Sequence, residues 1–437
     1  MPGKVAASLA AHGAHFRAAA EENHHLVIGP GPALEAEWTA AGLDLPDLPA
    51  MRRHRLDRVR SQLRQSGLGG IILYDPMNVR YATDTTNMQV WVMHNGARYA
   101  WVSADGPVIV WDFFECDFFA GHNDLVDEVR PAIGTTVFLA GRRTEDMTRR
   151  WAADVLSVID EFAGRDSPVA VDQLGYQQYR ALEEAGVEIA NGQLVMEMAR
   201  KVKGPDELRA MRCAVHACES TMSEMHELIA ELPTGTTERD IWSALHAGNI
   251  RRAGEWVETQ ILSSGPRTNP WMQEASARLV EPGDMVAYDT DLVGAYGMMV
   301  DVSRSRIAGG LAPTPAQRHV FDLACEQIVR NTELLTPGRS LSDLSHSAWM
   351  PPVDTYRHYC CLFHGVGQCD EYPDVFVPET WDDVGWDDEL EAGMVMTVES
   401  FVGRRDGCGE GVKLENQVLI TETGPELLTH LPLDLVG

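Results

Sequence analysis

The sequence predicts an α+β protein with two domains, and three observations lead to this prediction. The chain has 437 residues, of which 44% are hydrophobic. That is enough for a full core and for more than one domain of the usual size of about 100 to 200 residues. Strand-like and helix-like segments alternate over roughly the first 190 residues. Near residue 200 the pattern changes to long amphipathic helices, which apolar strands follow. We therefore expect an α/β domain over residues 51–195 and a second domain over residues 200–437.

Residues 1–50 are expected to form an N-terminal arm. Gly and Pro are frequent from Gly29 to Pro49, which favours an extended segment over a packed element. Such an arm lies across a partner subunit or is a loose terminus. His12, His15 and Arg17 interrupt the opening residues before a secretory core could form. No run approaches the roughly 18 to 20 apolar residues of a membrane helix, so we expect a cytoplasmic protein.

Helix, strand and hairpin signals follow one another through the first domain. Leu56, Val59 and Leu63 recur at helical spacing within residues 51–65. After this helix come a strand that enters a turn (GGIILYDP), a hairpin that turns at Asp105-Gly106 (YAWVSADGPVIVWD) and a strand-to-helix step (DSPVAVDQLGYQQYRALEEAG). This order is typical of an α/β domain.

Two helices are expected to open the second domain. Pro205 and the acidic pair Asp206 and Glu207 mark the start of a long helix, whose Met-rich apolar stripe is interpreted as core packing. A second helix is expected in the segment TERDIWSALHAGNIRRAG. Strand-like runs dominate the rest of the chain.

Charge and cysteine content exclude several classes of function. Lys and Arg total 36 against 65 Asp and Glu, and the net charge of −29 repels phosphate backbones and anionic membranes. We therefore expect neither nucleic acid nor a membrane as a partner. The eight cysteines have no regular spacing, which indicates reduced thiols rather than a disulfide framework.

The segment DMVAYDTDLVGAYGMMVDVSRSRIAGG carries the first chemical signal. It has the pattern of a hairpin that turns at Gly294 to Gly297. Asp289 and Asp291 are two residues apart and would share one side of a strand, and Asp301 on the returning strand could face them. Three acids on an apolar hairpin would repel one another unless a cation compensates them, and a solvated edge is the alternative.

Three further polar residues stand within apolar, strand-like runs. These are His364 in CLFHGVGQC, Glu399 in GMVMTVESFVG and Glu415 in GVKLENQVLIT. Singly, each could be a satisfied polar group of the core. Together with the aspartates they form a set of oxygen donors and one imidazole, which suits Mn, Fe, Co or Zn.

The second half of the chain resembles the pita-bread family of creatinase, prolidase, aminopeptidase P and methionine aminopeptidase. The resemblance is carried by the order Asp, Asp, His, Glu, Glu, by the patterns GxxxTxE and LENxVLIT and, in the first half, by DPMNVRYATD, which resembles a strand end of the creatinase branch. It implies a pita-bread catalytic domain after a creatinase-like domain. It also implies one or two metal ions held by Asp289, Asp291, Asp301, His364, Glu399 and Glu415.

Two histidines of the family's hydrolases are absent. In SSGPRTNPWMQ, Trp271 stands where one of them is expected, and in HGVGQCDEYP, Asp370 replaces the other within a motif that is one residue shorter. The aspartate spacing also departs from the family, because Asp289 and Asp291 precede Asp301 by twelve and ten residues. A full ligand set without these histidines favours a changed reaction over a lost one.

These departures resemble the dimethylsulfoniopropionate lyase branch of the family. The resemblance implies an iron-containing homodimer that splits a small zwitterionic substrate into dimethyl sulfide and acrylate. Asp370 would be the general base, and Trp91, Trp271 and Tyr359 would bind or orient the substrate. Trp91 is expected in a loop, in the segment TTNMQVWVMHNG. The alternatives are a hydrolase of the Xaa-Pro peptidase, prolidase or creatinase type and a binding module without catalysis.

Overall fold

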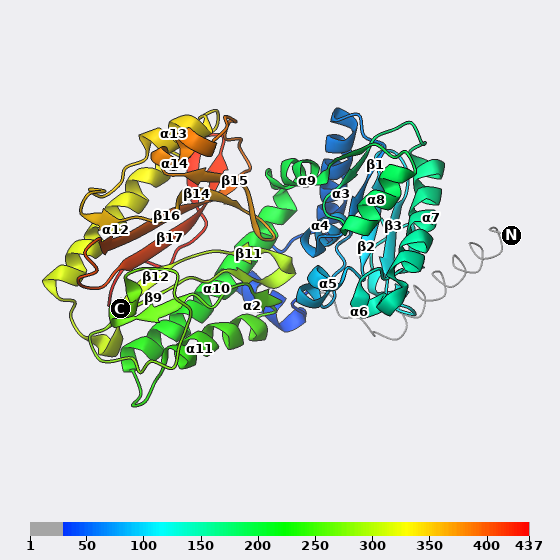
Figure 1. Cartoon of the computed structure of the whole chain (residues 1–437). Coiled ribbons are helices and arrows are strands. Elements are labelled where there is room, and N and C mark those ends of the chain that lie inside the picture. The colour runs from blue at the N-terminus through cyan, green and yellow to red at the C-terminus, as the bar shows by residue number, and fades with distance from the viewer. Residues whose placement is uncertain (1–28, 437) are drawn as a thin grey trace. The chain divides into compact units, whose positions relative to one another are not determined.

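The structure is a computed structural model that describes residues 29–436. The predictions about residues 1–28, which include the start of the N-terminal arm, lie outside the described residues. The described chain forms two compact units, here called unit 1 (residues 47–200) and unit 2 (residues 29–46 together with residues 201–436). Their elements are labelled in Figure 1.

Unit 1 is built on a mixed sheet with the strand order β4-β3-β2-β1-β5-β6. The pairs β1/β5, β5/β6 and β3/β4 are parallel, and β1/β2 and β2/β3 are antiparallel. The expected hairpin is confirmed, because Tyr99 pairs with Trp111 and Val102 with Val108. The strands are β1 (Gly70–Leu73), β2 (Tyr99–Ser103), β3 (Val108–Asp112), β4 (Glu128–Pro131), β5 (Val169–Val171) and β6 (Ile189–Asn191).

Helices cover both faces of this sheet, as strand alternation requires. Ile71 and Leu73 of β1 belong to a core that includes residues of α3 and α9, whereas Ile72 belongs to a second core with Trp151 of α7 and Leu182 of α8. The helices are α3 (Leu48–Gln65), α4 (Pro76–Thr83), α5 (Gln89–Asn95), α6 (Val137–Ala140), α7 (Thr144–Phe162), α8 (Tyr176–Glu184) and α9 (Gly192–Arg200), with the 3-10 turns η1 (Asp117–Ala120) and η2 (Gly141–Arg143).

Two segments of unit 1 differ from their expected conformation. The family-like segment DPMNVRYATD was expected at a strand end, but it forms helix α4 because Asp75 caps its first amides and Pro76 occupies the first turn. The segment around Trp91 was expected to be a loop, and it forms helix α5. The polar run TTNM lies directly before this helix and is not part of it.

The described part of the N-terminal arm is also packed rather than extended. Residues 32–40 form helix α2 (Pro32–Ala40), whose Trp38 is fully buried and meets the ring of Tyr296 at 6.0 Å between centroids. Both residues belong to unit 2. The expectation of an extended arm was wrong for residues 32–40, because the buried Trp38 packs this helix against the rest of unit 2.

Unit 2 contains two expected long helices and several small sheets. The sheet orders are β11-β10-β7, β12-β9-β8 and β15-β14-β16-β17-β18, with β13 paired to β16. The helices are α10 (Pro205–Glu231), α11 (Glu238–Arg251), α12 (Pro315–Thr332), α13 (Leu341–Ser347) and α14 (Pro378–Val384), with the 3-10 turns η3 (Gly265–Thr268), η4 (Ala295–Gly297) and η5 (Ala308–Gly310). The strands are β7 (Trp256–Val257), β8 (Leu262–Ser264), β9 (Met285–Tyr288), β10 (Leu292–Val293), β11 (Met299–Val300), β12 (Arg304–Ile307), β13 (Tyr356–Arg357), β14 (Cys361–Val366), β15 (Asp370–Phe376), β16 (Val395–Arg404), β17 (Val412–Thr421) and β18 (Gly424–Leu427).

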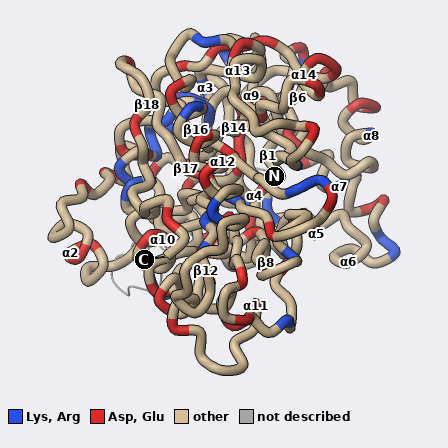
Figure 2. Tube along the Cα trace, turned by 90° about the vertical axis from the view of Figure 1, so that its left-hand side faces the viewer, with Lys and Arg blue, Asp and Glu red and all other residues tan. Residues whose placement is uncertain are grey.

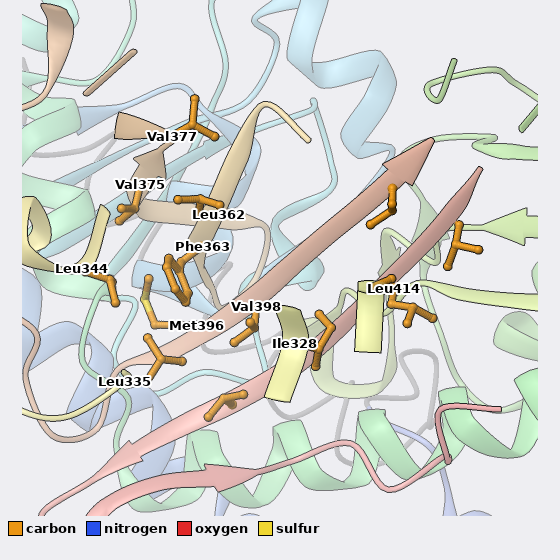
Figure 3. Close-up of a cluster of buried hydrophobic side chains, with 14 of the residues drawn as sticks. Ile328, Leu335, Leu344, Leu362, Phe363, Val375, Val377, Met396, Val398 and Leu414 are labelled. Atoms are coloured by element: carbon orange, nitrogen blue, oxygen red, sulfur yellow. The ribbon is translucent and has the colours of Figure 1, made fainter. Parts of the chain in front are cut away.

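The main core of unit 2 lies between α12 and the long strands β16 and β17 (Figure 3). Met396 and Val398 of β16 and Leu414 of β17 face this core, together with Ile328 of α12. Because side chains alternate across a strand, the odd-numbered residues of both strands face the opposite side. Glu399, among these residues, is thereby turned toward the candidate site.

Charged residues are scattered along the trace of both units, and acidic ones predominate (Figure 2). Within residues 29–436, no helix is both long and apolar enough to cross a membrane.

Candidate metal centre

The three aspartates lie where both strands of the expected hairpin are interrupted. β9 pairs with β12 and β10 pairs with β11, and residues 289–291 connect β9 to β10. Thr290 connects the two interrupted strands, because its hydroxyl donates to Val300 O at 2.8 Å and accepts from Val302 N at 3.0 Å. Asp289 and Asp291 were expected on one regular strand, and this expectation was wrong. Asp291 has a φ of 37°.

The break nevertheless brings the aspartates together. One carboxylate oxygen from each of Asp289, Asp291 and Asp301 lies within 4.8 Å of the others, and all three residues are buried. The Thr259 hydroxyl donates to Asp291. The predicted convergence is present, although a kink rather than strand alternation produces it.

The two glutamates face each other across a strand pair. Glu399 of β16 and Glu415 of β17 are direct cross-strand partners, and they are 2% and 0% exposed. Like charges directly opposite each other destabilise a sheet, and uncompensated buried charges are costly. This pair therefore requires a positive charge close by.

His364 on β14 meets the carboxylates through one ring nitrogen. Its Nε2 lies 3.3 Å from Asp301 Oδ2, 3.4 Å from Glu399 Oε1 and 3.7 Å from Glu415 Oε1. Its Nδ1 lies 3.1 Å from the carbonyl oxygen of Gly365. Asp301, His364 and Glu415 can each offer one atom to a common point, because these atoms lie within 4.8 Å of one another.

These donors fit a bound transition-metal ion. Asp301 Oδ1 and Glu415 Oε1 are buried and have no hydrogen-bond partner among the described residues. Buried carboxylate oxygens without partners are expected to coordinate a cation. Carboxylates with one imidazole suit Mn, Fe, Co or Zn, as the sequence indicated.

Lys413 is a member of the site that the sequence reasoning missed. Its ammonium is fully buried and lies 2.6 Å from Glu399 Oε2 and 3.2 Å from both Asp289 Oδ2 and Glu415 Oε2. It also donates to the Ser303 hydroxyl at 2.7 Å. The signal was present in the sequence, because Lys413 precedes Glu415 by two positions and therefore shares its face of β17.

The pKa of the aspartate beside His364 and the pKa of the aspartate beside Lys413 shift in opposite directions. The pKa of Asp301 is raised by burial and by the charge of Glu415. Burial also acts to raise the pKa of Asp289, but the Lys413 ammonium and hydrogen bonds from neighbouring side chains together outweigh it, and the net shift is downward. Burial opposes charge on His364 as well, yet hydrogen bonds to Asp301 and Glu399 raise its pKa well above the ordinary value.

Aromatic rings line the site next to Lys413. The Lys413 ammonium lies 4.6 Å from the ring centroid of Tyr359 and 5.9 Å from that of Trp271. Trp271 is buried and stacks on Phe401, with 6.2 Å between centroids. The structure thus brings two of the three expected aromatic residues to the candidate metal ligands. Phe401 was missed, although it follows Glu399 by two positions on β16.

Asp370 and Trp91 occupy different surroundings. Asp370 begins β15, its Oδ1 lies 3.6 Å from His364 Nδ1, and 56% of its side chain is exposed. Desolvation by the surrounding site and the charges of Asp289 and Glu399 raise the pKa of Asp370, although the charge of His364 opposes this. Trp91 belongs to unit 1, where its ring packs against Phe113 and Phe138.

Comparison with protein-family models assigns the class. The model of the creatinase/prolidase N-terminal domain matches residues 55–202, and that of metallopeptidase family M24 matches residues 209–422. The chain belongs to this family of pita-bread metalloenzymes.

Within the family, the chain is similar to two curated lyases. It is 43% identical over 416 residues to the dimethylsulfoniopropionate lyase DddP of Roseovarius nubinhibens. The aligned region covers 94% of this chain and 93% of that protein. It is 42% identical over 410 residues to the lyase of the same name from Roseobacter denitrificans, with coverage of 93% and 92%.

Solved structures support the same fold. The Xaa-Pro dipeptidase from Bacillus anthracis superimposes with a TM-score of 0.69 at 19% identity and covers 88% of this chain and 99% of its own. At this identity the likeness concerns the fold alone. The expected pita-bread domain after a creatinase-like domain is thus confirmed.

Proposed function

We propose that this protein is a metal-dependent lyase that cleaves dimethylsulfoniopropionate into dimethyl sulfide and acrylate. The observation that carries the proposal is the similarity to two lyases of this name over more than nine-tenths of the chain. The site supports it, because a full set of metal donors stands beside Trp271 and Asp370 where family hydrolases are expected to carry histidines.

The metal ligands of the proposed enzyme are the buried donors already described. They are Asp289, Asp291, Asp301, His364, Glu399 and Glu415. We propose iron, with Mn, Zn and Co as alternatives that the same donors accept, and one or two ions. When bound, the metal supplies Lewis-acid polarisation of the substrate carboxylate, which makes the proton on the adjacent carbon more acidic.

Asp370 is the proposed general base. Its carboxylate would take the proton from the carbon next to the substrate carboxylate. The electrons of that C–H bond form the C=C bond of acrylate, while the C–S bond breaks and its electron pair leaves with dimethyl sulfide. The partly exposed side chain of Asp370 next to His364 gives it access to a bound substrate. The Gly365 carbonyl oxygen already accepts from His364 at 3.1 Å, so that ring does not need Asp370 to orient it.

Aromatic faces would hold the sulfonium group of the substrate. A cation over a Trp or Tyr ring gains about 0.5 to 2 kcal/mol. Trp271 and Tyr359 line the site beside Lys413, which supports their role. Trp91 is proposed as a third substrate-binding residue on the resemblance alone.

We also propose that the enzyme is a homodimer. Large apolar side chains around Trp91 are exposed on unit 1, and an exposed patch of this kind often marks an interface. They are Met88, Val90, Met93, Phe114, Val137 and Phe138. Light scattering of the purified protein measures the oligomeric state directly.

The Asp370→Asn variant tests the reaction and the base together. Asn keeps the shape of the side chain but cannot accept the proton, so dimethyl sulfide release should fall by about 100-fold or more. Metal content should stay at the wild-type level. Headspace detection of dimethyl sulfide and metal analysis on the same preparation provide both measurements.

Asp374→Asn is the matched control, because Asp374 lies on the same strand opposite His364 and is exposed. It should leave the rate unchanged. A retained rate in Asp370→Asn would reject Asp370 as the base, and lost metal would make it a ligand. Wild-type protein that releases no dimethyl sulfide but hydrolyses Xaa-Pro dipeptides would reject the lyase in favour of the hydrolase.

A further inference from the structure

The turn that carries Asp370 is held from inside unit 2. Met299 N donates to Gly367 O at 2.8 Å, and Gly367 N donates to Cys369 O at 3.0 Å. Gln368 N donates to the carboxylate of Glu371 at 3.1 Å. The same carboxylate packs on Gly367 so closely that a Cβ there would lie 2.2 Å from Glu371 Oε1. The Glu371 carboxylate thus contacts both Gly367 and Gln368, and these contacts stabilise the turn 367–371.

Glu371 is held in turn by Lys203. The Lys203 ammonium lies 2.7 Å from Glu371 Oε2, and the two side chains are 2% and 1% exposed. Lys203 lies just before helix α10, and its backbone amide donates to Gly393 O at 2.9 Å. The ion pair therefore ties together three segments that are distant in the sequence.

Strand alternation links this anchor to the base. Asp370 and Glu371 are adjacent on β15, so their side chains point to opposite sides of the strand. Glu371 is buried with Lys203, whereas Asp370 points to the His364 side with much of its surface exposed. Anchoring Glu371 fixes the rotation of the strand and, with it, the direction of the Asp370 carboxylate.

Stability alone does not explain a buried pair of this kind. Replacing such a pair by apolar side chains is often neutral or stabilising, because desolvation offsets the attraction. An ion pair does, however, specify one geometry where an apolar contact would tolerate several.

We infer that Lys203 and Glu371 are positioning residues that hold the turn 367–371 so that Asp370 meets the substrate. This inference rests on the proposed role of Asp370 as the base. A displacement of a catalytic group by about 1 Å can cost about 100-fold in rate. The expected effect of losing the pair is therefore on turnover rather than on substrate or metal binding.

The experiment compares Glu371→Gln, Lys203→Met and the double variant Lys203→Met/Glu371→Leu. In each variant kcat should fall by about 10- to 100-fold while KM and metal content stay near wild type. The primary isotope effect for substrate deuterated next to the carboxylate should rise, because proton abstraction becomes slower. The double variant should regain thermal stability without regaining kcat.

The control is the pair Arg278–Asp284 in the same unit, joined at 2.6 Å and largely buried. Asp284→Asn should lower the melting temperature and leave kcat and the isotope effect unchanged. A double variant with wild-type kcat, or a loss of kcat that only follows the loss of stability in all variants, would overturn the inference.

A measurement without activity separates this inference from the proposed function. Hydrogen exchange of the Gln368 amide should accelerate in Lys203→Met, because its acceptor Glu371 loses its anchor. If exchange accelerates but the wild-type protein releases no dimethyl sulfide, the proposed function fails while the anchoring stands. If exchange and kcat are both unchanged, the anchoring itself is wrong. If Glu371→Gln loses kcat while Asp370→Asn retains it, the pair does not act through Asp370.

Discussion

The two sides of the candidate metal centre balance the same buried charge in different ways. On the His364 side, Asp301 and the Oε1 atoms of Glu399 and Glu415 surround the imidazole Nε2 at 3.3 to 3.7 Å. On the Lys413 side, Asp289 and the Oε2 atoms of both glutamates surround an ammonium at 2.6 to 3.2 Å. Each glutamate therefore contributes one oxygen to each side.

The difference teaches where a metal ion is needed. Burial opposes the charge on Lys413, but the surrounding carboxylates raise its pKa well above the ordinary value. The pKa of Asp289 beside it is lowered despite burial. On the His364 side, burial and the charge of Glu415 raise the pKa of Asp301, and two carboxylate oxygens have no hydrogen-bond partner among residues 29–436. The Lys413 ammonium compensates the carboxylates on one side, whereas the two carboxylate oxygens without partners on the other side favour a bound metal ion.

The largest effect on activity is expected from removing a carboxylate on the His364 side of the site. Asp301→Asn removes a charged donor at nearly constant volume, so bound metal and lyase activity should fall together, the activity by about 100-fold or more. Metal analysis and dimethyl sulfide release on one preparation test this, with Asp374→Asn as the control that keeps both. Full metal occupancy in Asp301→Asn would remove Asp301 from the ligand set.

The next effect comes from the Lys413 side. Lys413→Met leaves Asp289, Glu399 and Glu415 without their buried counter-ion, and removing one partner of such a pair costs about 3 to 5 kcal/mol. The free energy of unfolding of the metal-free protein, from chemical denaturation, should fall by this amount. Lys413→Arg keeps the charge and should lose less. Equal stability of Lys413→Met and wild type would mean that this side does not need its cation.

The smallest effect is the pH dependence of metal binding. The pKa values of Asp301, Glu415 and His364 are raised in the metal-free protein, so these groups retain protons above their ordinary pKa values. A metal ion must displace those protons, and its affinity should therefore fall as the pH falls. The change is about tenfold per pH unit for each proton released. Calorimetry in buffers of different ionisation enthalpy counts these protons, and a pH-independent affinity would contradict the difference between the two sides.

Local patterns in the sequence were enough for many elements. Helix α10 begins at Pro205 as expected, because Pro and acidic residues in a first turn favour a helix start regardless of tertiary contacts. The hairpin of β2 and β3 and the helix α3 follow from equally local signals. The metal-ligand candidates could be named as well, because a charged residue within an apolar run is conspicuous.

The sequence by itself determined which residues could bind a metal ion, and the tertiary structure decided how they are arranged. The pairing of Glu399 with Glu415 depends on strand register, which no local pattern specifies. The kink that joins Asp289 and Asp291 to Asp301 depends on Thr290 bonds to the returning strand. Lys413 is surrounded by carboxylates from three other positions in the chain. Contacts between distant residues follow from packing of the whole unit, whereas composition and periodicity report only on neighbours along the chain.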